Sequence, residues 1–138
     1  MIIVVDTNVV VSACLGPDGP SREVVRRALV GTYHPIVGAA LFAEYEAVFA
    51  RDELFARCVL SANDRNELLD AFLSVCEWTR VYYAWRPNVP DESDNHVIEL
   101  AVAGGADAIV TKNVRDFSRM ELRFPNLRIV TPAALLKE

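Results

Sequence analysis

Short runs of apolar residues recur along the chain, and each is too short to be a helix of its own. The first run, Ile2-Ile3-Val4-Val5, has only β-branched aliphatic side chains and no polar alternation. This pattern is typical of a parallel strand that is covered on both faces. The predicted strands are residues 2–5, 35–37, 81–84, 108–111 and 127–130.

Segments with helical spacing of apolar residues lie between these runs. The strongest of them has Leu68, Leu69, Phe72, Leu73 and Cys76 on one stripe. The predicted helices are residues 21–31, 40–50, 63–77, a stretch from Asp91 to Gly104, and a short terminal helix, with Ser21, Ser61, Asp91 and Thr131 as N-caps. Strands that alternate with helices predict an α/β sandwich with a mostly parallel central sheet.

The composition narrows the class of protein. A chain of 138 residues with 52% hydrophobic and 24% charged residues is expected to form one globular domain over residues 1–138. No apolar run approaches the roughly 20 residues that cross a bilayer, and no secretory segment precedes Asp6, so we expect a cytoplasmic protein with no membrane partner. The three cysteines have no Cys-x-x-Cys spacing and are predicted to be buried, reduced thiols.

The charge balance bears on nucleic-acid binding. A formal net charge of −5 argues against binding through bulk positive charge. The 14 cationic residues nevertheless include 12 arginines in sequence clusters, and arginine can grip phosphate bidentately. A local basic groove and ordinary solvated helix faces both remain open.

Polar side chains follow the predicted strands, at the edge of a parallel sheet where ligands bind. Asp6-Thr7-Asn8 follows the first strand, and Thr111-Lys112-Asn113 ends the fourth. Asp91 and Asp94 open the preceding helix, and Glu44 lies on the helix after the second strand. Carboxylates that converge in this way repel one another unless a hard divalent cation such as Mg²⁺ binds them.

Each of these side chains also has an ordinary structural interpretation. Asp6 could begin a turn, Glu44 could belong to a solvated helical face, and Asp94 could cap its own helix. Loop or lining positions are the simplest interpretation of Asn113, Asp116 and His96.

The combined pattern is more informative than any one residue. Asp6-Thr7-Asn8 after an N-terminal strand, the segment 41–49 around Glu44, Asp91-x-x-Asp94-Asn95, and the stretch from Gly105 to Phe117 together resemble the PIN domain. The sequence is similar in particular to the VapC-like branch of toxin–antitoxin proteins, over essentially the whole chain.

The resemblance implies a three-layer α/β/α sandwich and a Mg²⁺- or Mn²⁺-dependent ribonuclease, the toxin of a toxin–antitoxin pair. Asp6, Glu44 and Asp94 match the acidic triad, and Asn113 stands where many members have a fourth aspartate. These four are the expected catalytic and metal-binding residues. The expected supporting residues are Thr7, Asn8, Asp91, Thr111, Lys112 and Asp116. The implied partners are an RNA substrate, an antitoxin protein and a second copy of the chain.

Other classes of protein fit the sequence less well. A receiver domain needs a phospho-accepting aspartate at the end of a middle strand, and a haloacid-dehalogenase phosphatase needs Asp-x-Asp where this chain has Asp6-Thr7-Asn8. The remaining alternative is a catalytically weak PIN module that binds RNA or a protein without turnover. It is favoured by Asn113, which removes one negative charge, and by the acidic composition.

Overall fold

The computed structural model describes residues 1–16, 18–81, 95–118 and 126–138. Its centre is a five-stranded sheet with the order β3-β2-β1-β4-β5, in which every described pairing is parallel. The strands are β1 (Ile2–Val5), β2 (His34–Val37), β3 (Glu77–Trp78), β4 (Ala108–Val110) and β5 (Arg128–Val130). The predicted α/β class and parallel sheet are confirmed.

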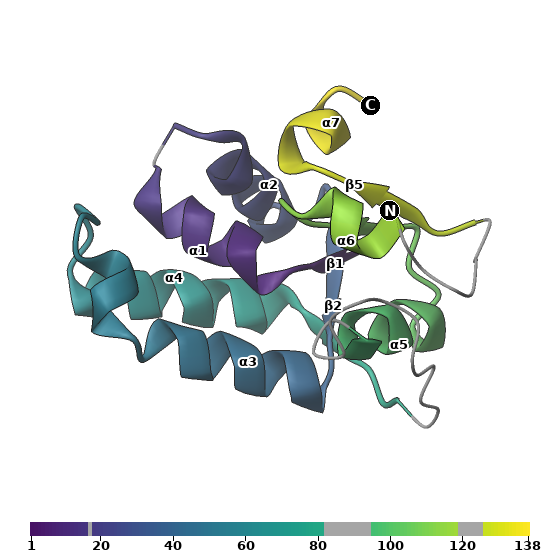
Figure 1. Cartoon of the computed structure of the whole chain (residues 1–138), viewed down its shortest axis with the longest axis horizontal. Coiled ribbons are helices and arrows are strands. Elements are labelled where there is room, and N and C mark those ends of the chain that lie inside the picture. The colour runs from purple at the N-terminus through teal and green to yellow at the C-terminus, as the bar shows by residue number, and fades with distance from the viewer. Residues whose placement is uncertain (17, 82–94, 119–125) are drawn as a thin grey trace.

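Helices cover both faces of this sheet (Figure 1). The helices are α1 (Thr7–Leu15), α2 (Pro20–Leu29), α3 (Ala39–Phe49), α4 (Ala62–Val75), α5 (Asn95–Ala103), α6 (Val114–Ser118) and α7 (Pro132–Leu136), with a 3₁₀ turn η1 (Asp52–Phe55). Figure 1 shows α1 to α4 on one side of β1 and β2, and α5 on the other side. The three-layer arrangement is therefore confirmed as well.

The core lies where the apolar runs predict it. Ile3, Val4 and Val5 of β1 and Ile109 and Val110 of β4 have no exposed surface. A strand with side chains buried on both faces needs no polar alternation, which explains the uniform run at the N-terminus. β1 and β4 pair directly, with Ile3 opposite Ala108 and Val5 opposite Val110.

Two of the predicted helix caps are confirmed by their hydrogen bonds. Ser61 Oγ accepts a hydrogen bond from the Asp64 amide at 3.1 Å, and Thr131 Oγ1 accepts one from the Ala134 amide at 3.1 Å. The expected cap of α2 at Ser21 is wrong, because Gly19 precedes the helix and Pro20 takes its first position. The proline ring already has a helical φ and lacks the amide that a cap would satisfy. The predicted cap at Asp91 lies outside the described residues.

Other expectations at the level of elements need correction. The third strand is residues 77–78, where Ile36 pairs with Glu77 and Val37 with Trp78. The described part of the predicted strand 81–84 is Val81, which lies beyond this pairing. Helix α1 and the short α6 were not predicted. The reason for α1 is that Val9, Val10, Ala13 and Cys14 are buried and Val11 is half-buried, so this helix has no clear polar face to reveal its period.

The structure also bears on the state of the cysteines and on membrane association. All three cysteines are free thiols; Cys14 is buried, and Cys58 and Cys76 are only partly buried. Within the described ranges, the structure contains no helix that is both long and apolar enough to traverse a bilayer.

Candidate active site

The candidate site lies where the connections of the sheet change direction. From β1 the chain proceeds outward to β2 and β3, and it then returns to the other side of β1 to form β4 and β5. β1 and β4 are adjacent, so the loops that leave their carboxyl ends diverge. Such a switch point is the usual ligand-binding crevice of a parallel sheet. Asp6 directly follows β1, and Thr111 directly follows β4.

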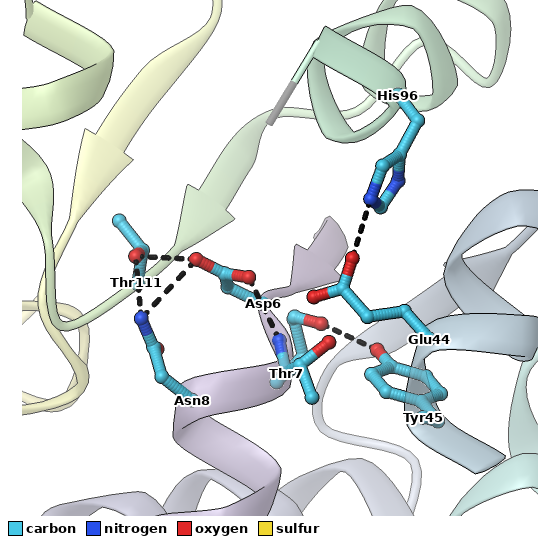
Figure 2. Close-up of polar contacts among 8 residues, drawn as sticks. Asp6, Thr7, Asn8, Glu44, Tyr45, His96 and Thr111 are labelled. Carbon is cyan, nitrogen blue, oxygen red and sulfur yellow. Dashed lines mark hydrogen bonds and ion pairs between the residues drawn. The ribbon is translucent and has the colours of Figure 1, made fainter. Parts of the chain in front are cut away.

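Asp6 is held by hydrogen bonds to both of its carboxylate oxygens (Figure 2). It is the N-cap of α1, and its Oδ1 accepts a hydrogen bond from the Thr7 amide at 2.8 Å. Its Oδ2 accepts one from Thr111 Oγ1 at 2.8 Å and one from Asn8 Nδ2 at 3.3 Å. The side chain is buried, so these contacts give the carboxylate one defined orientation.

The loops after β1 and β4 are joined by the same network. Thr111 Oγ1 accepts hydrogen bonds from the Asn113 amide at 3.0 Å and from Asn8 Nδ2 at 3.4 Å. Asn8 Oδ1 accepts one from the Lys112 amide at 3.1 Å. Asn8 and Thr111 therefore set the position of Lys112 and Asn113 relative to Asp6.

Glu44 reaches the site from α3. In Figure 2 its carboxylate lies between the His96 ring and the side chains of Asp6 and Thr7. Glu44 Oε2 is 2.6 Å from His96 Nε2. The neighbouring Tyr45 is fully buried, and its hydroxyl donates a hydrogen bond to the Val5 carbonyl oxygen. This bond attaches α3 to the end of β1 and brings Glu44 close to Asp6.

The electrostatics of the site favour a bound cation. Burial raises the pKa of Asp6 above its ordinary value, and the negative charge of Glu44 raises it further. The hydrogen bonds from Thr111 and Thr7 and the charge of His96 act in the opposite direction but do not cancel these effects. A raised carboxyl pKa means that the folded protein holds the negative charge at a cost, which a cation beside it would offset.

A cleft of about 560 Å³ opens over these residues. It is lined by Asp6, Thr7, Asn8, Ser12, Glu44, Lys112, Asn113 and Asp116 together with Val11, Leu15, Val48 and Leu54. Thr111 is completely buried and acts on the cleft through Asp6 and the two loops. The structure thus brings Asp6, Glu44, Asn113 and Asp116 to one cleft. Asp91 and Asp94 lie outside the described residues.

The donor atoms in this cleft fit a hard divalent cation. The carboxylates of Asp6 and Glu44 and the side-chain amide of Asn113 supply the oxygen ligands that Mg²⁺ and Mn²⁺ prefer. The Thr7 hydroxyl oxygen is buried and has no hydrogen-bond partner among the described residues, so it is available to an ordered ligand or water. Within the described residues, no three His, Cys, Asp or Glu side chains lie close enough to form a metal site.

Two residues of the site were not selected from the sequence. His96 was expected to be a lining residue, yet it pairs with Glu44, and its only sequence signal is its place two residues after Asp94. Ser12 lines the cleft, and its Oγ is 3.3 Å from Lys112 Nζ. Without α1 in the prediction, nothing in the sequence brings residue 12 to this edge of the sheet.

Comparisons with known proteins agree with this architecture. The family model described as "PIN domain" matches residues 2–115. A search of curated proteins found no significant match. Among solved structures, the fold is similar to a chain of VapBC2 from Rickettsia felis, which was crystallised bound to a DNA fragment from their promoter. The TM-score is 0.64 at 18% sequence identity, over 95% of this chain and 98% of that chain. The family match extends from β1 to α6 and includes both loops of the cleft, and the chain belongs to the PIN domain family.

Proposed function

We propose that this protein is a Mg²⁺- or Mn²⁺-dependent endoribonuclease and the toxin of a toxin–antitoxin pair. The observation that carries the proposal is the oriented, buried Asp6 carboxylate, placed with Glu44 in an open cleft at the switch point of a PIN domain. Metal-dependent cleavage of a phosphodiester needs a site of this kind, with anionic oxygen ligands beside a space that admits the substrate backbone.

In this proposal Asp6, Glu44, Asp94 and Asn113 hold the metal. When bound, the metal would supply an activated water and would offset the negative charge that develops at phosphorus. Thr111 and Asn8 fix the orientation of the Asp6 carboxylate through their hydrogen bonds. His96 holds Glu44 through the contact at Oε2. Because the metal would hold the attacking water and the phosphate, no serine, cysteine or histidine nucleophile is needed.

The remaining residues of the cleft have supporting roles. Lys112 is exposed at the cleft and is the side chain that we assign to the phosphate backbone of the substrate. Asp116 lines the same cleft and adds negative charge where Asn113 supplies none. We assign the same supporting role to Asp91 from the sequence alone. Thr7 offers its hydroxyl oxygen to a ligand or an ordered water.

The biological setting is proposed on the same basis. The VapBC2 structure is a complex, and its likeness in fold over almost the whole chain favours an antitoxin protein as the partner. A toxin of this kind acts on cytoplasmic RNA, and a homodimer is the form in which we expect it to meet its partner.

A second candidate function is a module that binds RNA or a protein without turnover. The observation that favours it is Asn113, which lies in the cleft as a neutral ligand. With one charge fewer, a second cation would bind less tightly, and a mechanism that needs two metal ions would slow.

The test is digestion of a panel of end-labelled single-stranded and hairpin RNAs during titration with Mg²⁺ and Mn²⁺. Wild-type protein is expected to cut only with metal and to leave 5′-phosphate and 3′-hydroxyl ends. Because the metal contributes several kcal/mol and 1.36 kcal/mol is a factor of ten, Asp6→Asn is expected to lower the rate by at least about 100-fold.

Asp70→Asn is the matched control, since Asp70 is exposed on α4 and does not line the cleft. Its rate should equal that of the wild type. Cleavage by Asp6→Asn at nearly the wild-type rate would refute the assignment of Asp6. Failure of the wild type to cut any RNA of the panel would favour the non-catalytic module.

A further inference from the structure

A second hollow lies at the same edge of the sheet, over the carboxyl ends of β2 and β3. Its volume is about 470 Å³. Its walls include Gly38 at the start of α3, Thr79 and Arg80 after β3, and Leu100 of α5. Gly38, Thr79, Arg80 and Leu100 do not belong to the candidate metal site.

The hollow adjoins the carboxylate cleft at the pair formed by His96 and Glu44. His96 lines the hollow, Glu44 lines the cleft, and the two side chains are 2.6 Å apart. The two spaces therefore meet at this pair of side chains. The two spaces together have the form of a reaction site with an adjoining subsite.

Trp78 is the main feature of this hollow. It is the last residue of β3, and it is 55% exposed, although large aromatic side chains are usually buried. Its ring packs edge-on against Phe42, with centroids 6.0 Å apart and an interplanar angle of 66°. An indole that is positioned by a neighbouring ring and still largely open to solvent offers a surface on which a planar base can stack.

Positive charge lies beside this ring. Arg80 is exposed two residues after Trp78 and lines the same hollow. Ala39 and Ala40, at the start of α3, are also exposed and line it, and the N-cap Gly38 has no side chain to bond the first amides of that helix. Among the residues that the structure describes, no side chain caps this 11-residue helix through Gly38, and its first amides and the adjacent guanidinium are complementary to phosphate.

Gly38 lets the start of α3 pack closely against Thr79, in the chain that follows β3. A Cβ on this residue would lie 3.1 Å from the Thr79 carbonyl oxygen and 3.3 Å from Leu100 Cδ1. Any larger residue would separate the start of α3 from the chain that follows β3. The close approach therefore keeps the α3 amides next to Arg80 and Trp78.

We infer that this hollow is a nucleotide subsite for single-stranded RNA, in which Trp78 stacks on a base while Arg80 and the first amides of α3 bind its phosphate. The inference rests on the proposed function, because it places this nucleotide next to the bond that is cut at the cleft. It assigns to the hollow a role in holding the substrate and none in the chemical step.

The first test uses the fluorescence of Trp78. The chain has two tryptophans, so Trp85→Phe leaves Trp78 as the only reporter. In metal-free buffer with EDTA, a tetranucleotide of RNA should quench this fluorescence in a saturable way, because a stacked base contacts the indole. An abasic ribose-phosphate tetramer should quench it far less. Equal quenching by the two tetramers, or no quenching by either, would overturn the inference.

The second test measures affinity for the same RNA tetranucleotide by its anisotropy. Trp78→Ala should weaken binding roughly 5- to 150-fold, the range for loss of one stacked base, and Trp78→Phe should retain most of the affinity. Arg80→Gln should lower the slope of log K against log salt by about 0.7, the value for one phosphate on a single strand. Arg57→Gln, an exposed arginine away from the hollow, should leave affinity and slope unchanged.

The results separate this inference from the proposed cleavage activity. If the wild type cleaves RNA in a metal-dependent way but Trp78→Ala changes neither the affinity nor the Michaelis constant, the subsite is refuted. The proposed ribonuclease activity would still stand. If the RNA tetranucleotide quenches Trp78 in a base-dependent way but the protein cuts no RNA, the result would support the subsite and refute cleavage. Thermal melts of each variant confirm that a loss of affinity does not come from unfolding.

Discussion

At the scale of single residues, Asp6 has two roles that act on its charge in opposite directions. As the N-cap of α1 it accepts a hydrogen bond from the Thr7 amide and lies at the positive end of the helix dipole, and both effects favour the carboxylate. Burial and the nearby Glu44 disfavour it, and they prevail, since the pKa of Asp6 is raised. An ordinary capping aspartate on the surface would not have this imbalance.

The imbalance predicts how the stability of Asp6→Asn depends on pH without metal. A carboxyl group whose folded pKa is raised contributes stability below its unfolded pKa, and this contribution is lost as the pH rises through the folded pKa. The wild type loses it as the pH rises from about 4, the ordinary value of an aspartate, through the raised pKa of the folded state, whereas the variant has no such group. The free energy of unfolding of the variant minus that of the wild type should therefore increase from pH 4 to pH 7.

Urea unfolding in EDTA at a series of pH values measures this difference. The variant also loses one acceptor, because an amide nitrogen in the place of Oδ2 cannot accept the hydrogen bonds from Thr111 Oγ1 and Asn8 Nδ2. That loss lowers the stability at every pH and leaves the trend unchanged. If this difference in the free energy of unfolding stays constant or decreases with pH, the folded protein does not disfavour the charged form of Asp6.

At the scale of elements, the ends of helices decide where the cleft residues lie. Helix α5 ends in a Schellman motif, in which the Ala106 amide bonds the Ala101 carbonyl at 2.9 Å and the Gly105 amide bonds the Val102 carbonyl at 3.3 Å. Gly105 has a φ of +63°, in the left-handed region that favours glycine. This turn leads directly into β4, at whose end Thr111 bonds Asp6.

Gly105→Ala is expected to destabilise the protein by about 1–2 kcal/mol, the cost of a left-handed conformation for a residue with a Cβ. Apart from its chain neighbours, no atom of the described residues lies within 4 Å of the added methyl group, so the effect would come from backbone strain alone. Chemical denaturation of the purified variant measures it.

Gly16→Ala is the matched control for this element. Gly16 follows α1 with a φ of −131°, and the nearest atom to an added Cβ is the Ser12 carbonyl oxygen at 3.8 Å. An alanine fits there without strain, so its stability should equal or slightly exceed that of the wild type. Equal stabilities of the two variants would argue against the left-handed turn at Gly105.

At the scale of the whole molecule, the cleft exists only in the folded chain. Asp6 follows β1 and Glu44 is on α3, 38 residues away in sequence, while Asn113 and Asp116 follow β4. Unfolding separates these side chains, so a cation that needs several of them binds the native state and stabilises it by mass action.

Mg²⁺ or Mn²⁺ is therefore expected to raise the melting temperature of the wild type. At a concentration ten times the dissociation constant the gain is about 1.4 kcal/mol, or about 4 °C for a chain of this size. Asp6→Asn should lose most of this gain. Thermal melts with NaCl at matched ionic strength control for screening, and an unchanged melting temperature across a millimolar titration of both metals would contradict the proposed centre.

Local physical chemistry was sufficient to predict several elements and the edge of the sheet at which the site lies. β1 and β4 are uniform apolar runs, and Ser61 and Thr131 are caps with short-range hydrogen bonds, so the sequence alone identifies them. Because parallel strands end at the same edge of a sheet, Asp6 and Thr111 could also be expected there together. Glu44 could be placed near the same edge because its helix follows the second strand, and the family pattern then matched it to the acidic triad.

Tertiary structure alone decided the rest, because those features depend on partners far away in sequence. β3 forms at residues 77–78 because β2 pairs with them, and the aromatic residues that follow have equal local propensity for a strand. Helix α1 buries apolar side chains nearly all around, so its period is hidden until its neighbours are known. His96 meets Glu44 across 52 residues, and Trp78 remains exposed on Phe42 because the β3 register leaves it there. Hydrophobic pattern and capping act within a few residues, whereas long-range packing sets the distances between side chains on which the chemistry depends.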